Sequence, residues 1–141
     1  MNVKYRRITM DEGKMNNLLT MEERTMVRDL ILLPYIDTMV SNSMRETELS
    51  GNVLAKTYLM AGQYIQKRIM QDIYRLRQEL KQRNVKVVED KNDDFIIYNM
   101  IYYRGYQERF GMTRDVMKTE ISLRLTQYTA DYGSVLNDYL K

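Results

Sequence analysis

The residue types available for chemistry are restricted, because the sequence contains no cysteine and no histidine. Metal sites built from thiolate or imidazole ligands are therefore excluded. Nucleophile pairs that depend on cysteine or histidine are excluded as well. Carboxylates, lysines and hydroxyls remain, but histidine is the side chain that most often serves as acid or base. We therefore expect a protein that is not an enzyme and has no cofactor and no metal site.

Methionine and tyrosine stand out, with 12 of each among 141 residues. Methionine suits adaptable binding surfaces, and tyrosine combines apolar area with a polar tip. One group lies off the main apolar face of a long predicted helix, and another lies on a predicted hairpin. These predicted partner-binding residues are Met60, Tyr64, Met70 and Tyr74 on the helix and Tyr98, Tyr102, Tyr103 and Tyr106 on the hairpin. We expect them to bind a protein partner or a second copy of the chain, although burial inside the bundle is the commoner cause of a second apolar face on a helix.

Basic residues concentrate in one segment. Residues 52–86 carry eight basic and two acidic side chains, whereas the whole chain has a net charge of +3. Such a segment is typical of contacts with nucleic-acid phosphates. It also fits a solvated helix surface that pairs with the acidic helix at 22–48 or with the acidic turn at 89–94. Within 67–86, the candidate nucleic-acid residues are Lys67, Arg75, Arg77 and Lys81.

The segment FGMTRDVMKTEI at 110–121 resembles the turn and recognition helix of bacterial helix-turn-helix regulators. In that family, an aromatic–Gly–apolar–Ser/Thr–Arg sequence leads into the second helix. The resemblance implies that Arg114 and Lys118 face a DNA groove. It departs from the family at Gln107, where a small residue is needed, and at Gly105, which would lie inside the preceding helix. A nucleic-acid-binding regulator is therefore our alternative function.

Two long helices are predicted in the first part of the chain. Thr20 and Glu23 form a capping box at the start of the first helix, which ends at a glycine cap at Gly51. At Pro34 we favour a kink in this helix over the alternative, a second helix that begins with Pro34 as its first residue. The second helix covers about 52–84, and we expect the fold to be organised around it. Its apolar residues recur at steps of three and four and define one buried face. They are Leu54, Tyr58, Ala61, Ile65, Ile69, Ile73, Leu76 and Leu80.

Residues 85–104 are predicted to form a β-hairpin, because a valine-rich segment, a polar turn and a β-branched, aromatic segment follow one another. A helix that begins at Asp93 or Asp94 is the competing interpretation, and it would restore the helix-turn-helix. A third helix is predicted over about 113–131, with a cap at Thr113 and an end at Gly133.

The predicted fold class is mainly α, a small helical bundle built on a long central helix, with the hairpin as a minor β component. We expect residues 1–141 to form a single domain, with 1–19 as an N-terminal arm or a short strand. No apolar run approaches the roughly 18 residues that span a bilayer, and the N-terminal residues lack an apolar signal region. We therefore expect a cytoplasmic protein that makes no membrane contact and acts by protein–protein interaction.

Overall fold

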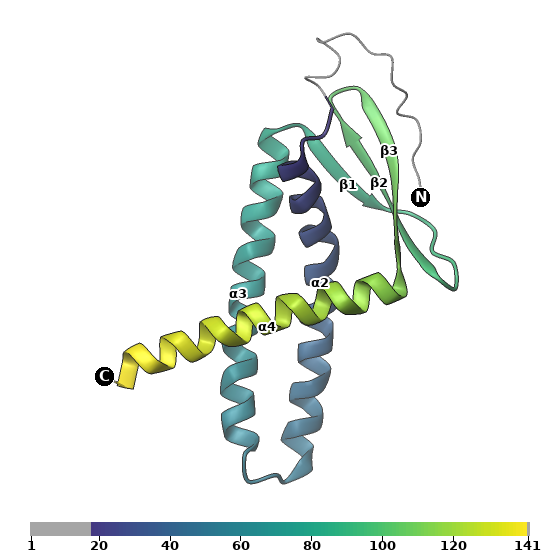
Figure 1. Cartoon of the computed structure of the whole chain (residues 1–141). Coiled ribbons are helices and arrows are strands. Elements are labelled where there is room, and N and C mark those ends of the chain that lie inside the picture. Colours follow the sequence, from purple (N-terminus) through teal and green to yellow (C-terminus); the bar gives the residue numbers. More distant parts are fainter. Residues whose placement is uncertain (1–17, 141) are drawn as a thin grey trace. The chain divides into compact units, whose positions relative to one another are not determined.

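The computed structural model describes residues 18–140. The elements shown in Figure 1 are α2 (Met21–Ser50), α3 (Ala55–Gln82), β1 (Val85–Glu89), β2 (Ile96–Tyr103), β3 (Tyr106–Thr113) and α4 (Arg114–Leu140). The fold is mainly α with a small antiparallel sheet, which confirms the predicted fold class. The predicted arm or strand at 1–19 lies outside the described residues except for its last two positions.

Helix α2 begins and ends at the predicted signals. The Thr20 N–H donates to Glu23 Oε1 at 3.1 Å, and the Glu23 N–H donates to Thr20 Oγ1 at 3.0 Å, which confirms the capping box. The helix continues through Pro34 to Ser50. Gly51 follows with a φ of 69°, the left-handed conformation that terminates many helices.

Helix α3 has the predicted apolar face over most of its length. Ile65, Ile69, Ile73, Leu76 and Leu80 are buried. The two residues predicted to begin this face, Leu54 and Tyr58, are exposed, so the prediction is wrong there. Leu54 precedes the helix and Tyr58 lies in its first turn.

The three strands form one sheet in the order β1-β2-β3, with both pairs antiparallel. The predicted β1–β2 hairpin is confirmed, and the competing helix from Asp93 is wrong. The strand β3 was not predicted. Its register places Glu108 opposite Ile101 of β2, which in turn faces Val87 of β1.

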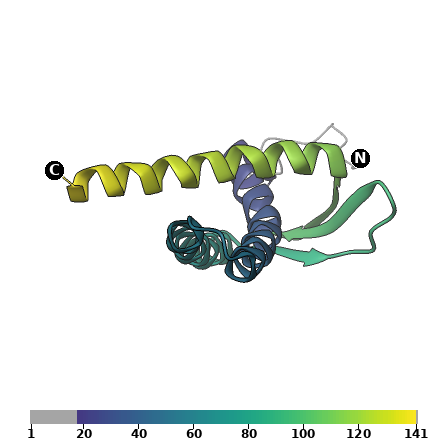
Figure 2. The same cartoon turned by 90° about the horizontal axis from the view of Figure 1, so that it is seen from below.

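Helix α4 is longer than predicted. Thr113 Oγ1 accepts the Val116 N–H at 3.2 Å, which confirms the predicted cap. The helix then passes through Gly133 and ends at Leu140, and Figure 2 shows it as one uninterrupted helix. The predicted end near residue 131 is therefore wrong, because Gly133 lacks the left-handed φ of a glycine cap.

The chain divides into two compact units. The first unit comprises Met1–Asp29, described from residue 18, and Leu76–Lys118. The apolar side chains of its core come from the start of α2 and the residue before Thr20, the end of α3, the inner face of the sheet and the start of α4. They are Leu19, Met26, Val27, Leu76, Leu80, Val85, Ile97, Ile101, Tyr103, Met112 and Met117.

The second unit comprises Leu30–Arg75 and Thr119–Lys141, described to residue 140. Here α2 and α3 lie antiparallel, since Gln66 donates to Ser41 Oγ and Gly62 lies against Met44. The apolar core of this unit is Ile31, Leu32, Leu33, Ile36, Val40, Ile65, Ile69, Ile73, Ile121 and Tyr128.

Candidate functional site

The turn between β2 and β3 carries an arginine in a conformation that favours glycine. Arg104 and Gly105 form this two-residue loop, with φ angles of 47° and 88°. Two consecutive positive φ angles match the twist of antiparallel strands. Glycine adopts them without cost, but for arginine the cost is about 1 kcal/mol or more. Contacts of the Arg104 side chain must outweigh that cost.

The Arg104 guanidinium joins three elements of the first unit. It donates to Glu23 Oε1 at 3.0 Å, to the Arg83 carbonyl at 2.7 Å and to the Leu18 carbonyl at 3.0 Å. Glu23 lies in the first turn of α2, and Arg83 follows the last residue of α3. A cation is favourable at the carbonyl end of a helix. The Arg104 N–H also donates to the Asn84 carbonyl at 3.3 Å. The backbone and side chain of Arg104 together fix the β2–β3 turn to α2 and α3.

Glu23 is the carboxylate at the centre of this network, and it is 5% exposed. Arg83 Nη1 lies 3.6 Å from Glu23 Oε2. Burial raises the pKa of Glu23, but hydrogen bonds from Arg104 and the Thr20 N–H outweigh it, together with the charges of Arg104 and Arg83. The net effect lowers the pKa of Glu23 below its ordinary value. Glu23 is therefore a structural anion and is poorly suited to donate a proton.

A second buried carboxylate, Glu108, lies on the inner face of β3 and is 4% exposed. Arg24 donates to Glu108 Oε2 at 2.7 Å and to Oε1 at 3.1 Å, and the Tyr103 hydroxyl donates to Oε1 at 3.0 Å. This two-pronged geometry is the strongest form of a charge-assisted hydrogen bond. Bonding to Glu108, against the opposing effect of burial, raises the pKa of Arg24. Glu23 and Glu108, the buried acids among the described residues of the first unit, are thus engaged by arginines of the same unit.

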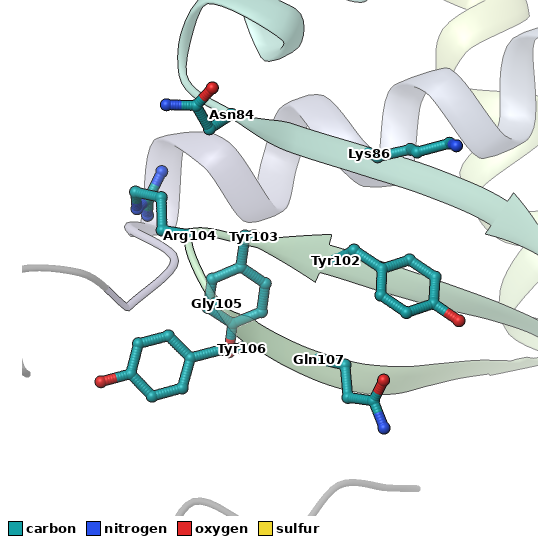
Figure 3. Close-up of a pocket in the computed structure, with 8 residues that line it drawn as sticks. All are labelled: Asn84, Lys86, Tyr102, Tyr103, Arg104, Gly105, Tyr106 and Gln107. Carbon is teal, nitrogen blue, oxygen red and sulfur yellow. The ribbon is translucent and has the colours of Figure 1, made fainter.

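A hollow of about 490 Å³ lies at the end of the sheet. Figure 3 shows the side chains that line it. Lys86, Tyr102 and Gln107 are cross-strand neighbours in it, and all three are exposed. Tyr103 is buried, and the Tyr106 ring stacks on it with centroids 5.6 Å apart. The hollow therefore offers one well-exposed ring beside a lysine and an amide. The described residues that line it are Asn84, Lys86, Tyr102, Tyr103, Arg104, Gly105, Tyr106 and Gln107.

Tyr98 is engaged within its own sheet. The Arg109 guanidinium carbon lies 3.6 Å from the Tyr98 ring centroid, and Arg109 Nε donates to Asp90 Oδ2 at 3.1 Å. Across the sheet Tyr98 faces Gly111, where an added Cβ would come within 2.9 Å of the ring. The Arg109 guanidinium stacked on the Tyr98 ring holds it in place, and Gly111 leaves room for the ring because glycine has no side chain.

The predicted hairpin group therefore divides into internal and exposed residues. The partner-binding prediction is wrong for Tyr103, whose ring is buried and whose hydroxyl is bound to Glu108. Tyr98 and Tyr106 are half-buried by contacts inside the sheet. Tyr102 is 42% exposed. The side chains around the β2–β3 turn therefore serve chiefly to stabilise the first unit.

The helical group divides in the same way. Tyr64 is half-buried, because its ring packs against Tyr132 of α4 with centroids 5.2 Å apart. Its hydroxyl accepts a hydrogen bond from Arg68 at 3.1 Å. Tyr64 therefore contributes to packing within the second unit.

The other helical residues remain uncovered in the described chain. Met60, Met70 and Tyr74 are 53%, 56% and 68% exposed. They follow one line along α3, and two exposed polar residues lie on the same line. We call this line the α3 stripe, and its members are Met60, Gln63, Lys67, Met70 and Tyr74.

Helix α4 carries a second uncovered apolar run, on residues 133–140, which we call the α4 tail. Its apolar side chains are between 37% and 85% exposed, and they are Val135, Leu136, Tyr139 and Leu140. Earlier on α4, Tyr128 is buried and its hydroxyl donates to Asp72 Oδ2 at 2.6 Å. Contiguous uncovered apolar surface of this kind often marks an interaction site.

The helix-turn-helix interpretation of 110–121 is wrong, because strands β2 and β3 occupy the place of its first helix. Arg114 does not serve as a groove-facing side chain here. Its Nε donates to the Asp94 carbonyl at 3.0 Å. Lys118 is exposed on the first turns of α4.

The basic segment keeps both of its predicted interpretations. Arg83 donates to Glu22 Oε1 and to Glu79 Oε2, each at 3.1 Å, so pairing with acidic neighbours is confirmed for this residue. The four candidate nucleic-acid residues Lys67, Arg75, Arg77 and Lys81 are exposed.

Sequence reasoning missed the three residues that hold the hairpin end, Arg104, Glu108 and Arg24. A two-residue loop with glycine between two strand-like segments is a hairpin signal, so Arg104–Gly105 could have been recognised. The Arg24–Glu108 pair joins positions 84 residues apart, and no local pattern reveals such a contact.

Residues 18–132 match the family model described as YhjD protein, and the match covers most of the chain. The chain belongs to the YhjD protein family. Comparison with curated proteins gives no match, and comparison with solved structures gives none. Of the helices in the described chain, none is long and apolar enough to cross a membrane. Within residues 18–140, no group of three or more acidic side chains is placed to hold a metal ion. The α4 tail lies beyond the residues that the family model matches.

Proposed function

We propose that this member of the YhjD family acts by binding another protein and catalyses no reaction. The observation that carries the proposal is the uncovered apolar surface of the second unit, on the α3 stripe and the α4 tail. Three of the five stripe residues are methionine or tyrosine, and each of these three is more than half exposed. Full burial of one such side chain contributes roughly 1.5–3 kcal/mol. A partner that covers the stripe would therefore gain substantial binding free energy.

The hairpin hollow supports this function less well. Its tyrosines make contacts within the sheet, and Tyr102 is the most exposed of the four. The nucleic-acid alternative retains exposed basic side chains, but the helix-turn-helix that would have supplied a recognition helix is absent. The helical surface thus favours a protein partner.

A non-enzymatic role and a cytoplasmic location belong to the same proposal. The sequence has no histidine or cysteine for nucleophilic chemistry. The buried acids Glu23 and Glu108 are paired with arginines, which gives both carboxylates a structural role. A cysteine-free chain agrees with a reducing compartment.

Photo-crosslinking in cells tests the proposal. A photoreactive amino acid replaces Met70 on the stripe, and a matched control places it at Glu46, an exposed position on α2. We expect a discrete protein adduct from position 70, lost when Tyr74→Glu is added, and no such adduct from position 46. Equal adducts from both positions, or none from position 70, would contradict the proposal.

A further inference from the structure

The apolar positions of α4 form one line that extends beyond its packing partner. Successive members are separated by four and three residues alternately, the spacing of a helix–helix seam. The first four are buried or half-buried, and two of them contact α3: the Tyr128 hydroxyl binds Asp72, and the Tyr132 ring packs on Tyr64. The last two are 48% and 85% exposed. The seam is Ile121, Leu125, Tyr128, Tyr132, Val135 and Tyr139.

The α3 stripe has the same spacing on a different face of its helix. Its five residues are separated by three and four residues alternately, and all are exposed. The buried face of α3 is formed by other residues, among them Ile65, Ile69 and Ile73. Because α4 already packs against α3 through Tyr132, the straight continuation of α4 cannot also cover the stripe of its own chain.

The charges of the two surfaces are opposite. Within 55–75 of α3, the exposed charged residues are Lys56, Lys67 and Arg75, and all are basic. Within 126–140 of α4, the charged residues are Asp131 and Asp138, both exposed and acidic. Complementary charge favours association and sets its orientation. One molecule therefore carries both halves of a matched contact that it cannot make with itself.

We propose that a second copy of this chain is the partner, with the α4 tail of each copy lying on the α3 stripe of the other. The inference rests on the proposed function and names its partner. Exchange between two copies makes the same contact twice, which is the form of a closed two-fold dimer. Val135 and Tyr139 would then pack beside Met70 and Tyr74, in the same way that the earlier seam residues pack within the chain.

Charge exchange between two variants tests the pairing. Lys67→Glu opposes the stripe to the acidic tail, and Asp138→Lys opposes the tail to the basic stripe. Each variant alone is expected to dimerise about tenfold more weakly at low salt, because each repels its own copy twice. An equimolar mixture is expected to restore dimerisation, since a mixed dimer has one native contact and one exchanged contact, both attractive. Lys91→Glu, on the loop between β1 and β2, is the control for Lys67→Glu, because it makes the same change in charge at an exposed position.

Sedimentation of the full chain over a range of concentrations, with one variant carrying a mass tag, measures these effects. A dimer of wild type and a mixed dimer in the mixture would support the inference, and normal circular dichroism of each variant excludes loss of folding. A wild type that stays monomeric, or a mixture that is no more dimeric than its components, would overturn it. If position 70 still crosslinks to a different protein, the inference fails while the proposed function stands.

Discussion

Replacing Arg104 with alanine is expected to lower the free energy of unfolding by about 3 kcal/mol. The substitution removes the donors to Glu23 and to the Arg83 and Leu18 carbonyls. Breaking a buried ion pair costs about 3–5 kcal/mol, because the remaining charge is left without its partner. Arg83 and the Thr20 N–H still contact Glu23, which places the effect at the lower end of that range.

A glycine at the same position separates the side chain from the backbone. Arg104→Gly loses the same hydrogen bonds, but glycine adopts the φ of 47° without strain. We therefore expect Arg104→Gly to be about 1 kcal/mol more stable than Arg104→Ala. Equal stability of the two variants would show that the turn stores no strain at this residue.

Urea unfolding of the full chain, followed by circular dichroism, measures both changes. Arg109→Ala is the matched control, because Arg109 pairs with Asp90 and stacks on Tyr98 at a more exposed position. Its expected cost is about 1 kcal/mol or less. A double-mutant cycle of Arg104→Ala with Glu23→Gln should give a coupling of about 1–3 kcal/mol. Equal costs for the two arginines, or a coupling near zero, would refute the role assigned to Arg104.

Three further predictions concern other parts of the structure. Because the folded pKa of Glu23 is lowered, its contribution to stability is present above the unfolded pKa and is lost as pH falls through the folded value. The stability difference between wild type and Glu23→Gln, measured by urea titration, should therefore shrink from about pH 5 to pH 3. A constant difference would contradict this. Tyr103→Phe removes a hydroxyl donor to the buried Glu108 and should cost about 1.5 kcal/mol by the same measurement, whereas an unchanged stability would argue against that hydrogen bond. Gly62→Ala should stabilise α3 by about 1 kcal/mol in a Met44→Ala background. It should give no gain in the wild type, where the new Cβ would lie 2.7 Å from the Met44 side chain. The same gain in both backgrounds would show that Met44 moves freely.

The local signals at helix starts were sufficient to predict most of the helices. The capping box at Thr20 and Glu23 and the cap at Thr113 appear in the structure as hydrogen bonds between neighbouring residues. Such contacts depend on positions three apart, so the sequence shows both partners at once. Gly133 misled the prediction because a glycine inside a helix costs only about 1 kcal/mol, which packing on either side can outweigh.

The missed strand β3 and the missed network have one physical cause. An amphipathic strand is recognised by apolar residues on its inner face, but β3 places Glu108 there. That position is favourable because Arg24 and the Tyr103 hydroxyl satisfy the carboxylate. Arg24 comes from a helix 84 residues away, so the pattern of β3 becomes intelligible once the tertiary structure is known.

The chain departs from the usual separation of apolar and polar residues in two opposite ways, and this contrast favours the helices as the binding surface. Among the described residues of the first unit two carboxylates are buried, but each has an arginine within 3.0 Å, so the chain itself compensates for their burial. In the second unit the methionines and tyrosines of the α3 stripe and the apolar residues of the α4 tail are exposed, and nothing in residues 18–140 covers them. The buried carboxylates are explained by their contribution to stability, because arginines of the same chain pair with them. The departure that the chain leaves uncompensated supports the proposed contact with another molecule, because the two exposed surfaces have matching spacing and opposite charge.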